Sequence, residues 1–597
     1  MTDTMGDWRR THSCGALRAA DAGQPVTLMG WAFRRRDHGG LIFVDLRDRE
    51  GVTQLVFDPA TAAAAHETAG RIRAEFVLAV QGQAERRPAG TVNPHLPTGE
   101  VEIRVQAFRI LNESKPLPFP LDESQETVEP LRLRYRYLDL RRPAMLRNLI
   151  LRDRVCQAVR DYLHREGFVE VETPALTRST PEGARDFLVP SRLSRGNFYA
   201  LPQSPQLFKQ ILMVAGLERY FQIVRCFRDE DLRADRQPEF TQIDVETSFL
   251  DRDDFLPIME GVVGEIFQRV MGVTVPRPFP RLAWDEAVAR YGSDKPDLRF
   301  GLELQDCSDL FRQAGFQVFA QAVARGGAVK ALTVPGEGFS RKDLDDLVEQ
   351  AKGFGAGGLV WVRVGEGALQ SPAARHLEPV RPALLERCGA GPGSLILLVA
   401  DTMPLAATVL GRLRVALAQR LGLVPAETFR LLWVVDFPLF EWSEEEKRWD
   451  AMHHPFTAPR DEDVATGLAD PARARAKAYD LVLNGQEIGG GSIRIHSRAL
   501  QQRVFELLGI GEAEARAKFG FLLDALEYGA PPMGGIAFGL DRIVAILAGV
   551  DSIREVIAFP KTQKGTCSLT DAPGPVSPVQ LAELGLTVEP EPPQGEH

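Results

Sequence analysis

Two strand-like segments joined by a densely charged loop constrain the fold of this chain more than any other feature. Tyr220–Phe227 (YFQIVRCF) has the composition of a strand, and Gln242–Glu246 (QIDVE) alternates strictly between polar and apolar residues. Side chains alternate between the two faces of a strand, so Ile243 and Val245 share one face and the polar residues share the other. We therefore expect an antiparallel pair of strands with the charged loop at one end.

The loop between these strands carries opposite charges at high density. The eighteen residues from Phe227 to Asp244 include three arginines and six carboxylates. The arginines are Arg228, Arg233 and Arg236. Guanidinium groups match phosphate oxygens through paired hydrogen bonds, so such a loop can fold over a triphosphate. A salt-bridged hairpin on the surface explains the same composition, and the loop alone does not separate the two alternatives.

At 597 residues the chain is too long for a single core. Residues 24–111 hold five short β-rich runs separated by turn signals, which favours a small barrel such as an OB-fold. A proline-rich segment beginning with KPLPFP follows and predicts a linker. Residues 291–424 change to glycine-rich, mixed strands and helices, which indicates an inserted domain.

Composition excludes several classes of function. The net charge of −10 disfavours a protein that coats nucleic acid through a broadly basic surface, and we expect no DNA partner. The six cysteines are scattered without a CxxC pair, which predicts reduced thiols and neither disulfides nor a zinc site. No apolar run approaches membrane length, and the first residues contain no apolar signal region. We therefore expect a cytoplasmic protein with no membrane partner.

A turn signal brings two carboxylates together. In AYDLVLNGQEIGGGSIRIH, Asn484-Gly485 is a strong two-residue hairpin signal. It sets Val482 opposite Glu487, so Asp480 and Glu487 fall on one face of the hairpin. Two carboxylates at this separation can share a magnesium ion that also binds phosphate oxygens. An edge strand with solvated charges is the alternative.

Two further segments carry charges in unusual places. In Gly534–Leu547 a glycine-punctuated strand enters an apolar helix, with Asp541 and Arg542 in its first turn. An arginine is unfavourable at a helix N-terminus, so we expect Arg542 to bind an anion from outside the helix. In Gln203–Gln210 (QSPQLFKQ), Lys209 follows two bulky apolar residues, and its side chain can extend to water along them.

These segments resemble the signature motifs of class II aminoacyl-tRNA synthetases. The charged loop with RQPEFTQID resembles motif 2, GIAFGLDR resembles motif 3, and the helical stretch before FVEVETP resembles motif 1, the dimer-forming element. The strings TPEGARDF, ALPQSPQLFKQ, YGSDKPDLR, MHHPFT and EIGGGSIRIH stand in the order of bacterial aspartyl-tRNA synthetases. The resemblance runs from about Arg9 to about Pro575. One departure is PPMGG, where Met533 stands in place of the family's usual histidine.

The resemblance implies an α+β multidomain fold with an N-terminal OB-fold β-barrel and a class II antiparallel-sheet catalytic domain, interrupted by an inserted α/β GAD domain. It divides the chain into an anticodon-binding barrel (1–112), a hinge or linker (113–145), the first catalytic part (146–290), the GAD insertion (291–424), the second catalytic part (425–566) and a C-terminal extension (567–597) whose end we expect to be disordered.

The resemblance also implies a two-step reaction. Aspartate is adenylated by ATP in the presence of Mg2+, and the aspartyl group then passes to the 3′ end of tRNA. The substrate's own carboxylate attacks, so catalysis depends on positioning and on neutralisation of charge. Motif 1 implies a homodimer.

Residue roles follow by matching each motif. The residues matched to catalysis are Arg228, Glu487 and Arg542. Those matched to L-aspartate are Glu182, Gln206, Lys209, Arg228, Asp244, His453 and Arg494. Those matched to ATP are Arg228, Asp229, Glu230, Gln237, Phe240, Glu487, Gly539, Leu540, Asp541 and Arg542. The carboxylates matched to magnesium are Asp480 and Glu487.

Within this set, Lys209 and Arg494 resemble a clamp for the side-chain carboxylate of aspartate. Asparagine would leave the two buried cations unpaired, at a cost of roughly 3–5 kcal/mol. The pair therefore argues against the related asparaginyl- and lysyl-tRNA synthetases. A non-catalytic RNA-binding relative would be expected to lose Arg228, Glu487 or Arg542, and the chain retains all three.

The barrel carries the residues matched to tRNA. Arg36, Phe43 and Gln54 match anticodon contacts, with Phe43 as a stacking platform, although an ordinary core residue is the alternative for Phe43. His38 and Gly90 resemble the non-discriminating bacterial form, which charges both tRNA-Asp and tRNA-Asn. Asp-tRNA-Asn would then pass to a tRNA-dependent amidotransferase. A discriminating enzyme with neutral substitutions at these two positions is the alternative.

Overall fold

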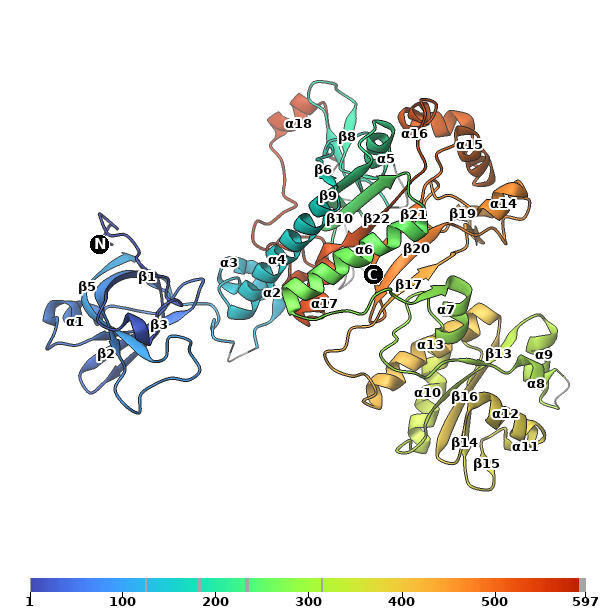
Figure 1. Cartoon of the computed structure of the whole chain (residues 1–597), viewed down its shortest axis with the longest axis horizontal. Helices are drawn as coiled ribbons and strands as arrows, with labels where there is room; N and C mark the ends of the chain where they lie inside the picture. Colours follow the sequence, from blue (N-terminus) through green and yellow to red (C-terminus); the bar gives the residue numbers. More distant parts are fainter. Residues whose placement is uncertain (1, 124–125, 181–183, 231–235, 313–314, 590–597) are drawn as a thin grey trace. The chain divides into compact units, whose positions relative to one another are not determined.

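The computed structural model describes residues 2–123, 126–180, 184–230, 236–312 and 315–589. The chain forms two compact units, Met1–Leu146 and Arg147–His597 (Figure 1). Residues 590–597, which include most of the end predicted to be disordered, lie outside the described residues.

The N-terminal unit contains a closed five-stranded barrel, as the five β-rich runs predict. Its strands are hydrogen-bonded in the order β1-β2-β3-β5-β4. Their bounds are Pro25–His38 (β1), Leu41–Arg47 (β2), Val52–Phe57 (β3), Val77–Arg86 (β4) and Val101–Asn112 (β5), with α1 (Ala63–Ala69) between β3 and β4. Alternate residues of β2, Ile42, Val44 and Leu46, are buried in the barrel core. The other residues of β2 therefore face outward, which is the pattern of an OB-fold wall.

The segment after the barrel is more ordered than the predicted linker. Helices α2 (Glu129–Arg134) and α3 (Arg136–Asp139) lie within it. Asp139 is fully buried and accepts hydrogen bonds from Arg132 at 2.8 Å and Arg136 at 2.5 Å. A buried carboxylate requires such partners. The prolines and acidic residues of this segment indicate a linker. Composition does not show which charged residues pair, so it does not predict the ordered helices.

The C-terminal unit is built on an eight-stranded sheet in the order β11-β17-β20-β21-β22-β10-β9-β6. The bounds are Arg281–Ala283 (β11), Leu431–Val435 (β17), Ala478–Leu483 (β20), Gln486–Ile493 (β21), Met533–Gly539 (β22), Glu239–Ser248 (β10), Arg219–Phe227 (β9) and Val169–Glu170 (β6). The central pairs are antiparallel, and the edge strands β11 and β6 pair in parallel with their neighbours. The predicted antiparallel pair that flanks the charged loop is thus β9 and β10.

Helices cover one face of this sheet. Residues of α4 (Pro143–Arg165), α6 (Arg252–Ile266) and α17 (Leu540–Ala548) join the strands in one apolar core, and Figure 1 shows α4 and α6 lying over the sheet. Ile243 and Val245 of β10 are part of this core. The alternation along the strand therefore turns the polar residues of β10 to the other face of the sheet.

The β20–β21 hairpin turns at the predicted dipeptide. Asn484 and Gly485 have φ values of 52° and 83°, as a type I′ turn requires. The register pairs Val482 with Glu487, as predicted, and a bulge between Leu481 and Val482 then shifts it by one residue.

A second, five-stranded antiparallel sheet lies within the predicted insertion, in the order β12-β13-β16-β14-β15. Its strands are Gln305–Asp306 (β12), Ala328–Pro335 (β13), Val360–Val364 (β14), Leu369–Gln370 (β15) and Ser394–Asp401 (β16). The helices here are Ser308–Phe311 (α8), Gln317–Ala324 (α9), Arg341–Gly353 (α10), Ala374–Leu377 (α11), Arg381–Cys388 (α12) and Met403–Arg420 (α13). Helix α7 (Trp284–Tyr291) meets α13 where Gly292 and Gly411 touch, and a Cβ on either glycine would overlap the backbone of the other.

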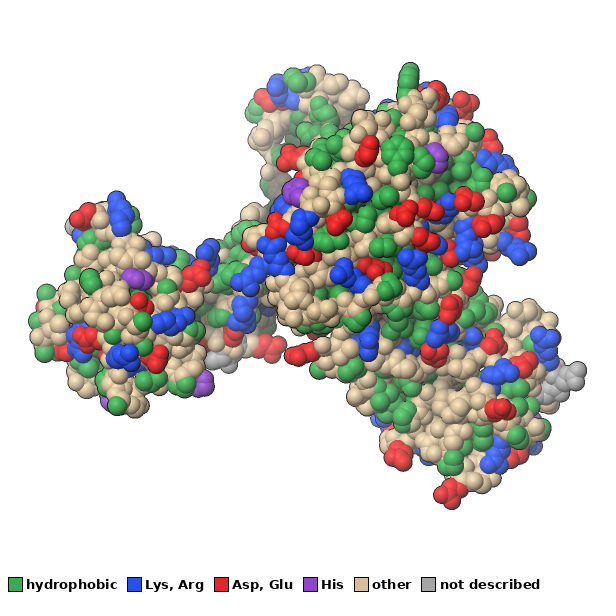
Figure 2. Space-filling view, viewed as in Figure 1, with side chains coloured by type: hydrophobic (Ala, Val, Ile, Leu, Met, Phe, Trp, Pro, Cys, Tyr) green, Lys and Arg blue, Asp and Glu red, His purple; other side chains and the backbone are tan. Residues whose placement is uncertain are grey.

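The remaining elements are Leu188–Pro190 (β7), Phe198–Ala200 (β8), Gln206–Val214 (α5), Phe440–Ser443 (β18), Arg448–Ala451 (β19), Asp461–Ala465 (α14), Arg498–Leu507 (α15), Glu512–Ala525 (α16) and Pro578–Leu584 (α18). All six cysteines are free thiols, as predicted. Among the described residues no helix is both long enough and apolar enough to cross a membrane. Acidic and basic side chains are interspersed on the face shown in Figure 2.

Candidate active site

Two adjoining cavities open on the polar face of the eight-stranded sheet. The first has a volume of about 550 Å³ and the second of about 340 Å³. The residues that line both are Arg228, Glu230, Gln242, Lys295, Glu487 and Ala537. Arg228, the first arginine of the charged loop, therefore stands at the junction of two polar compartments. Such a site suits a reaction between two polar substrates.

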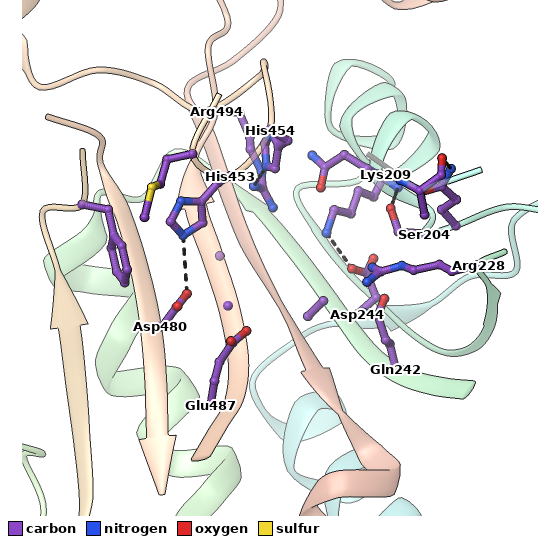
Figure 3. A pocket seen from close by; sticks show the side chains of 18 of the residues that line it. Ser204, Lys209, Arg228, Gln242, Asp244, His453, His454, Asp480, Glu487 and Arg494 are labelled. Carbon is purple, nitrogen blue, oxygen red and sulfur yellow. Dashed lines mark hydrogen bonds and ion pairs between the residues drawn. The ribbon is translucent and has the colours of Figure 1, made fainter. Parts of the chain in front are cut away.

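Four buried charged side chains line or support the wall of the first cavity. Lys209 of α5 donates to Asp244 of β10 at 2.6 Å and lies 3.3 Å from a carboxylate oxygen of Glu246. Arg494, which directly follows β21, donates to both oxygens of Glu246, at 2.9 and 3.0 Å. Figure 3 shows Lys209 and Arg494 approaching β10 from different elements. The predicted clamp residues are thus brought together, and Lys209 points inward instead of extending to water.

One prediction about this clamp is wrong in its physical basis. The two cations were expected to depend on the substrate for their partner, yet Glu246 of the chain itself pairs with both of them. Glu246 lies on the predicted polar face of QIDVE, but its position in the strand did not reveal that Lys209 and Arg494 converge on it.

The ionisation of this cluster follows from its pairing. Burial raises the pKa of Glu246, but Arg494 and Lys209 lower it more, so it stays below its usual value. Burial also raises the pKa of Asp244, which Lys209 offsets only in part. Burial lowers the pKa of Arg494, and the attraction of Glu246 outweighs this and raises it. Glu246 and Arg494 therefore remain a charged pair, which holds the arginine in one orientation.

His454 belongs to the same cluster and was not assigned to the site from sequence. Its Nε2 lies 2.7 Å from Arg494 Nη1, and its Nδ1 accepts a hydrogen bond from the Phe456 amide at 3.2 Å. Burial, followed by the charges of Arg494, His453 and Lys209, holds the pKa of His454 well below its usual value. The imidazole is therefore neutral beside the guanidinium.

Three of the predicted substrate residues carry a buried polar atom with no hydrogen-bond partner. These atoms are Gln206 Nε2, Asp244 Oδ2 and His453 Nδ1, and all three residues line the first cavity. A buried polar atom without a partner is costly in a folded protein, so its presence points to a ligand that supplies the partner. The roles of the three residues in binding aspartate stay predictions, and their position on the wall of the first cavity is compatible with them.

The carboxylates Asp480 and Glu487 converge as the hairpin predicts. A Cβ on Gly490 would lie 2.7 Å from Asp480 Oδ1 and 3.3 Å from Glu487 Oε1, so both carboxylates lie over this glycine. Burial and the charge of Glu487 raise the pKa of Asp480. Figure 3 shows this pair across the cavity from Lys209 and Arg228.

These two carboxylates fit a hard divalent cation. The described residues contain no group of three or more potential protein ligands for a metal. Magnesium typically takes one or two carboxylates from the protein and completes its shell with substrate phosphates and water. A pair of carboxylates next to an open cavity matches that requirement, and it does not match a metal held entirely by the protein.

Lys295 and His453 flank this carboxylate pair. The Lys295 ammonium lies 2.8 Å from Glu487 Oε2, and His453 Nε2 lies 3.6 Å from Asp480 Oδ1. Burial lowers the pKa of Lys295, but Glu487 outweighs this and raises it. Lys295 is part of the YGSDKPDLR string, to which the sequence analysis gives no site role.

The second cavity contains the predicted nucleotide residues. The Arg228 guanidinium lies over the Phe240 ring, 5.0 Å from its centroid. Arg542 of α17 lines this cavity with Gly539 and donates to the main-chain carbonyl of Glu487. The expectation that Arg542 binds an anion from outside its helix is therefore incomplete, because the chain itself supplies a carbonyl partner.

Other predicted nucleotide residues are engaged within the protein. The Gln237 amide bonds the main chain of Lys561, donating to its carbonyl and accepting from its N–H. The Asp541 carboxylate accepts from Arg152 at 2.5 Å and from the Thr241 amide at 2.8 Å. These side chains brace the loop and the helix, so a contact with ATP requires rearrangement or the use of main-chain atoms.

Two further predicted nucleotide residues do not point into the second cavity. The Leu540 side chain is buried in the core beneath the sheet, so only its main chain can approach a ligand. Asp229 lines a separate neighbouring cavity and lies 3.6 Å from Arg185. Glu230 does line the second cavity and pairs with Arg236 at 3.1 Å. Glu182, predicted to contact aspartate, lies outside the described residues, as does Arg233.

The barrel brings its predicted anticodon residues into one group. Arg36 pairs with Phe43 across β1 and β2, and its guanidinium bonds Asp45 at 2.8 Å and Gln54 Oε1 at 3.3 Å. Phe43 is half-buried between fully buried neighbours, so it lies on the outer wall. Gln54 is buried and donates to Glu102 at 2.9 Å.

The two residues matched to non-discrimination are both exposed on the barrel. His38 ends β1 beside the turn to β2, and Gly90 lies between β4 and β5. Gly90 has a φ of 83°, and a Cβ there would meet no atom within 4 Å. A larger residue at this position is therefore disfavoured by backbone strain and not by crowding.

An antiparallel sheet that carries an arginine loop, a carboxylate pair and a helix-borne arginine around two joined cavities defines the class II aminoacyl-tRNA synthetases. A family model described as "tRNA synthetases class II (D, K and N)" matches residues 128–563, and one described as "OB-fold nucleic acid binding domain" matches residues 26–111.

Three similar proteins identify the family within this class more closely, and each bears the name Aspartate--tRNA(Asp/Asn) ligase. The relative from Geotalea uraniireducens is 60% identical over 98% of this chain and 99% of its own length. Those from Moorella thermoacetica and Syntrophotalea carbinolica are 59% and 57% identical, again over 98% of this chain. They are covered over 98% and 99% of their own lengths, respectively. The chain belongs to the family of aspartate–tRNA(Asp/Asn) ligases.

Solved structures share the fold at much lower identity. A putative aspartyl-tRNA synthetase from Leishmania major is 18% identical with a TM-score of 0.59, over 94% of this chain and 96% of that chain. An asparaginyl-tRNA synthetase from Pyrococcus horikoshii complexed with asparaginyl-adenylate is 18% identical with a TM-score of 0.58, over 93% and 98%. These similarities concern the fold alone.

Proposed function

We propose that this chain activates L-aspartate with ATP to form aspartyl-adenylate and transfers the aspartyl group to the 3′ end of both tRNA-Asp and tRNA-Asn. The observation that carries the proposal is the buried Lys209–Glu246–Arg494 cluster in a cavity that meets a second cavity at Arg228. The names of the relatives support the same activity.

The cluster can select aspartate even though its cations are already paired. An ammonium has three donors, and Lys209 has two carboxylate neighbours. Arg494 gives Nε and Nη2 to Glu246, while its Nη1 faces Ser492 and His454. The side-chain carboxylate of aspartate can therefore accept hydrogen bonds from the Lys209 ammonium and the Arg494 guanidinium. The amide NH2 of asparagine is itself a donor, so it would face these donors without a favourable contact. Asparagine is therefore rejected by an unfavourable contact, not by the loss of the only partner of the cations.

The unpartnered atoms of the first cavity orient the rest of the amino acid. Asp244 Oδ2 is a buried acceptor and suits the α-ammonium group, and Gln206 Nε2 is a buried donor that suits a carboxylate oxygen. Both residues sit on regular elements, β10 and α5, so the substrate meets a preformed frame. A fixed orientation lowers the barrier because the reacting carboxylate is held toward the nucleotide.

The chemical step needs no nucleophile from the protein. An oxygen of the aspartate α-carboxylate attacks the α-phosphorus, and the bond to the β-phosphate breaks to release pyrophosphate. Arg228 stands at the junction of the two cavities, where the α-phosphate must lie, and its guanidinium neutralises charge there. Arg542, in the second cavity, serves the distal phosphates in the same way.

Asp480 and Glu487 would hold a magnesium ion, which supplies positive charge to the phosphate oxygens when it is bound. The chain's own part is to set these two carboxylates over Gly490, beside the junction of the cavities. A side chain at this position would crowd the two carboxylates, so glycine keeps room for them beside the cavity.

The transfer step requires the barrel, which binds tRNA. Arg36, Phe43 and Gln54 hold the anticodon, and His38 and Gly90 permit both tRNA-Asp and tRNA-Asn. Asp-tRNA-Asn is then a substrate for a tRNA-dependent amidotransferase. The enzyme acts as a homodimer in the cytoplasm.

Two assays test the proposal. ATP–pyrophosphate exchange with aspartate, asparagine or lysine as the amino acid should proceed with aspartate alone; exchange with either of the others would replace the assigned substrate. Charging of purified tRNA-Asp and tRNA-Asn should succeed with both. A rate near zero with tRNA-Asn would make the protein a discriminating enzyme specific for tRNA-Asp.

A further inference from the structure

One cation of the active site comes from outside the signature motifs. Lys295 lies in the segment between α7 and β12, near the start of the insertion predicted over residues 291–424. Its ammonium is 2.8 Å from Glu487 Oε2, and its side chain retains 39% exposure. Lys295 lines both cavities, a property it shares with Arg228 and Glu487. A cation at this junction is within reach of the boundary between the two substrates.

The backbone that carries Lys295 is held in place on the side of the sheet. Asp297 lies beneath the β20–β21 turn, where a Cβ on Gly485 would lie 3.2 Å from Asp297 Cβ. The Asp297 carboxylate also pairs with Arg299 at 2.7 Å. Asp297 is 5% exposed. Lys295 is therefore two residues from an anchored point on the hairpin that bears Glu487.

The same backbone is held from the inserted domain. Arg414 of α13 is 1% exposed and donates to the main-chain carbonyls of Asp297, Phe300, Gly301 and Leu302 at 2.8 to 3.1 Å. Its guanidinium lies 4.3 Å from the centroid of the Phe300 ring. Four bonds from one buried side chain leave the segment little freedom. The insertion thus fixes the position of a lysine at the active site.

The ion pair of Lys295 with Glu487 competes with a divalent cation for the same carboxylate. Asp480 and Glu487 place two negative charges over Gly490, and Lys295 compensates one of them. When a divalent cation takes up Glu487, Lys295 loses this partner and two like charges would face each other. The triphosphate brings several negative oxygens into the same space, which gives the ammonium a new partner. A half-exposed lysine can make this move because its stem is flexible.

We propose that Lys295 is a phosphate-binding residue of the adenylation reaction, which exchanges Glu487 for the phosphate oxygens of ATP that leave as pyrophosphate. In that reaction the α-phosphorus gains a bond to the aspartate carboxylate oxygen. The bond to the bridging oxygen of the β-phosphate breaks, and its electron pair leaves with pyrophosphate; no proton is transferred. Lys295 stabilises the charge that accumulates on this leaving group. The inference rests on the function proposed above.

A matched set of variants tests this role. Lys295→Met removes the charge and keeps the length of the stem, and Lys295→Arg restores a cation. Lys352→Met is the control, because Lys352 is an exposed lysine of the same insertion that pairs with Glu349 of its own helix. ATP–pyrophosphate exchange gives kcat and KM for each substrate, and calorimetry with ATP and Mg2+ in the absence of amino acid measures nucleotide binding directly.

For Lys295→Met we expect kcat/KM for ATP to fall by about tenfold or more, with KM for aspartate unchanged. Lys295→Arg should recover most of this loss, and the control should match the wild type. A melting-temperature titration with Mg2+ alone should reach its midpoint at a roughly threefold lower concentration in Lys295→Met, because a competing positive charge has gone. A purely structural lysine would not improve the response to Mg2+.

The outcomes separate the two proposals. Wild-type activity of Lys295→Met, or an equal loss against ATP and aspartate, would overturn the role of Lys295. An unchanged or weakened response to Mg2+ would overturn the exchange with Glu487. If the wild-type protein fails to activate aspartate, the proposed function fails, and the calorimetric comparison of ATP binding still decides the role of Lys295.

Discussion

Arg494 and Glu246 form a buried, two-bond ion pair in the wall of the first cavity, with distances of 2.9 and 3.0 Å. Glu246 also lies 3.3 Å from Lys209, so one carboxylate fixes two cations. The two cations proposed to bind the side chain of aspartate are therefore held in the folded core by the protein's own carboxylate. If the proposed function holds, the stability of the fold and the choice of amino acid depend on the same side chains.

Glu246→Gln should destabilise the protein, because it removes the carboxylate shared by Lys209 and Arg494. Breaking one partner of a buried ion pair costs about 3 kcal/mol. Calorimetric melting of the full chain measures this as a lower transition temperature. Glu514→Gln, which breaks an exposed pair with Lys518 on α16, is the control and should change the transition little. Equal melting of both variants would contradict the assigned role of Glu246.

Arg494→Leu should abolish aspartate activation while leaving a folded chain that binds ATP. The expected loss in kcat/KM for aspartate is about a hundredfold or more, since the substrate carboxylate loses a charged, buried donor. ATP–pyrophosphate exchange measures the loss, and calorimetry with ATP checks the nucleotide cavity. Normal adenylation of aspartate by this variant would remove Arg494 from the clamp.

His454 should make the stability of the C-terminal unit depend on pH. Its pKa in the folded protein is held well below the usual 6.5 by burial and by the charges of Arg494, His453 and Lys209. Below about pH 6.5 the imidazole of His454 binds a proton in the unfolded chain but stays neutral in the folded chain. Unfolding free energy therefore falls as the pH decreases, by up to about 1.4 kcal/mol per unit. Above this range the contribution is fully present.

The test is a comparison of melting temperatures between pH 7.5 and pH 5.5. His454→Asn should lose less stability on acidification than the wild type, because asparagine binds no proton in the unfolded chain. His496→Asn removes an exposed histidine of the same unit and should follow the wild-type curve. Parallel curves for all three proteins would show that His454 titrates normally.

Phe43→Ala should weaken the binding of tRNA without changing the rate of aspartate activation. One base stacked on an aromatic ring contributes about 1–3 kcal/mol, so KM for tRNA should rise roughly tenfold or more. ATP–pyrophosphate exchange should stay at the wild-type rate. A large drop in melting temperature with unchanged KM for tRNA would instead make the half-buried Phe43 a structural residue of the barrel.

His38→Leu should shift the balance between the two tRNAs. The change replaces one of the two residues that resemble the non-discriminating form, and we expect charging of tRNA-Asn to fall about tenfold relative to tRNA-Asp, a difference of about 1.4 kcal/mol. Charging both purified tRNAs in parallel measures the ratio. An unchanged ratio would mean that discrimination is set elsewhere. The test substitutes His38 and not Gly90, because the φ of 83° at Gly90 would strain the backbone of any larger residue there.

Much of the fold could be predicted because its signals are local. The alternation of QIDVE, the Asn484-Gly485 turn and the five short runs of the barrel each depend on neighbouring residues, and each appears in the structure as predicted. The Asp480–Glu487 pair follows from the same logic, because a two-residue turn sets the register of its strands. Residue roles drawn from motifs also depend on short stretches of chain.

The sequence by itself thus determined the barrel, the antiparallel sheet and the motifs around the site. Only the tertiary structure decided which charges neutralise one another: that Glu246 holds both Lys209 and Arg494, that Asp541 is bound to Arg152, and that Lys295 reaches Glu487. The physical reason is that burial and ion pairing join residues far apart in the chain. Their energies depend on distance and on exclusion of water, which periodicity does not encode.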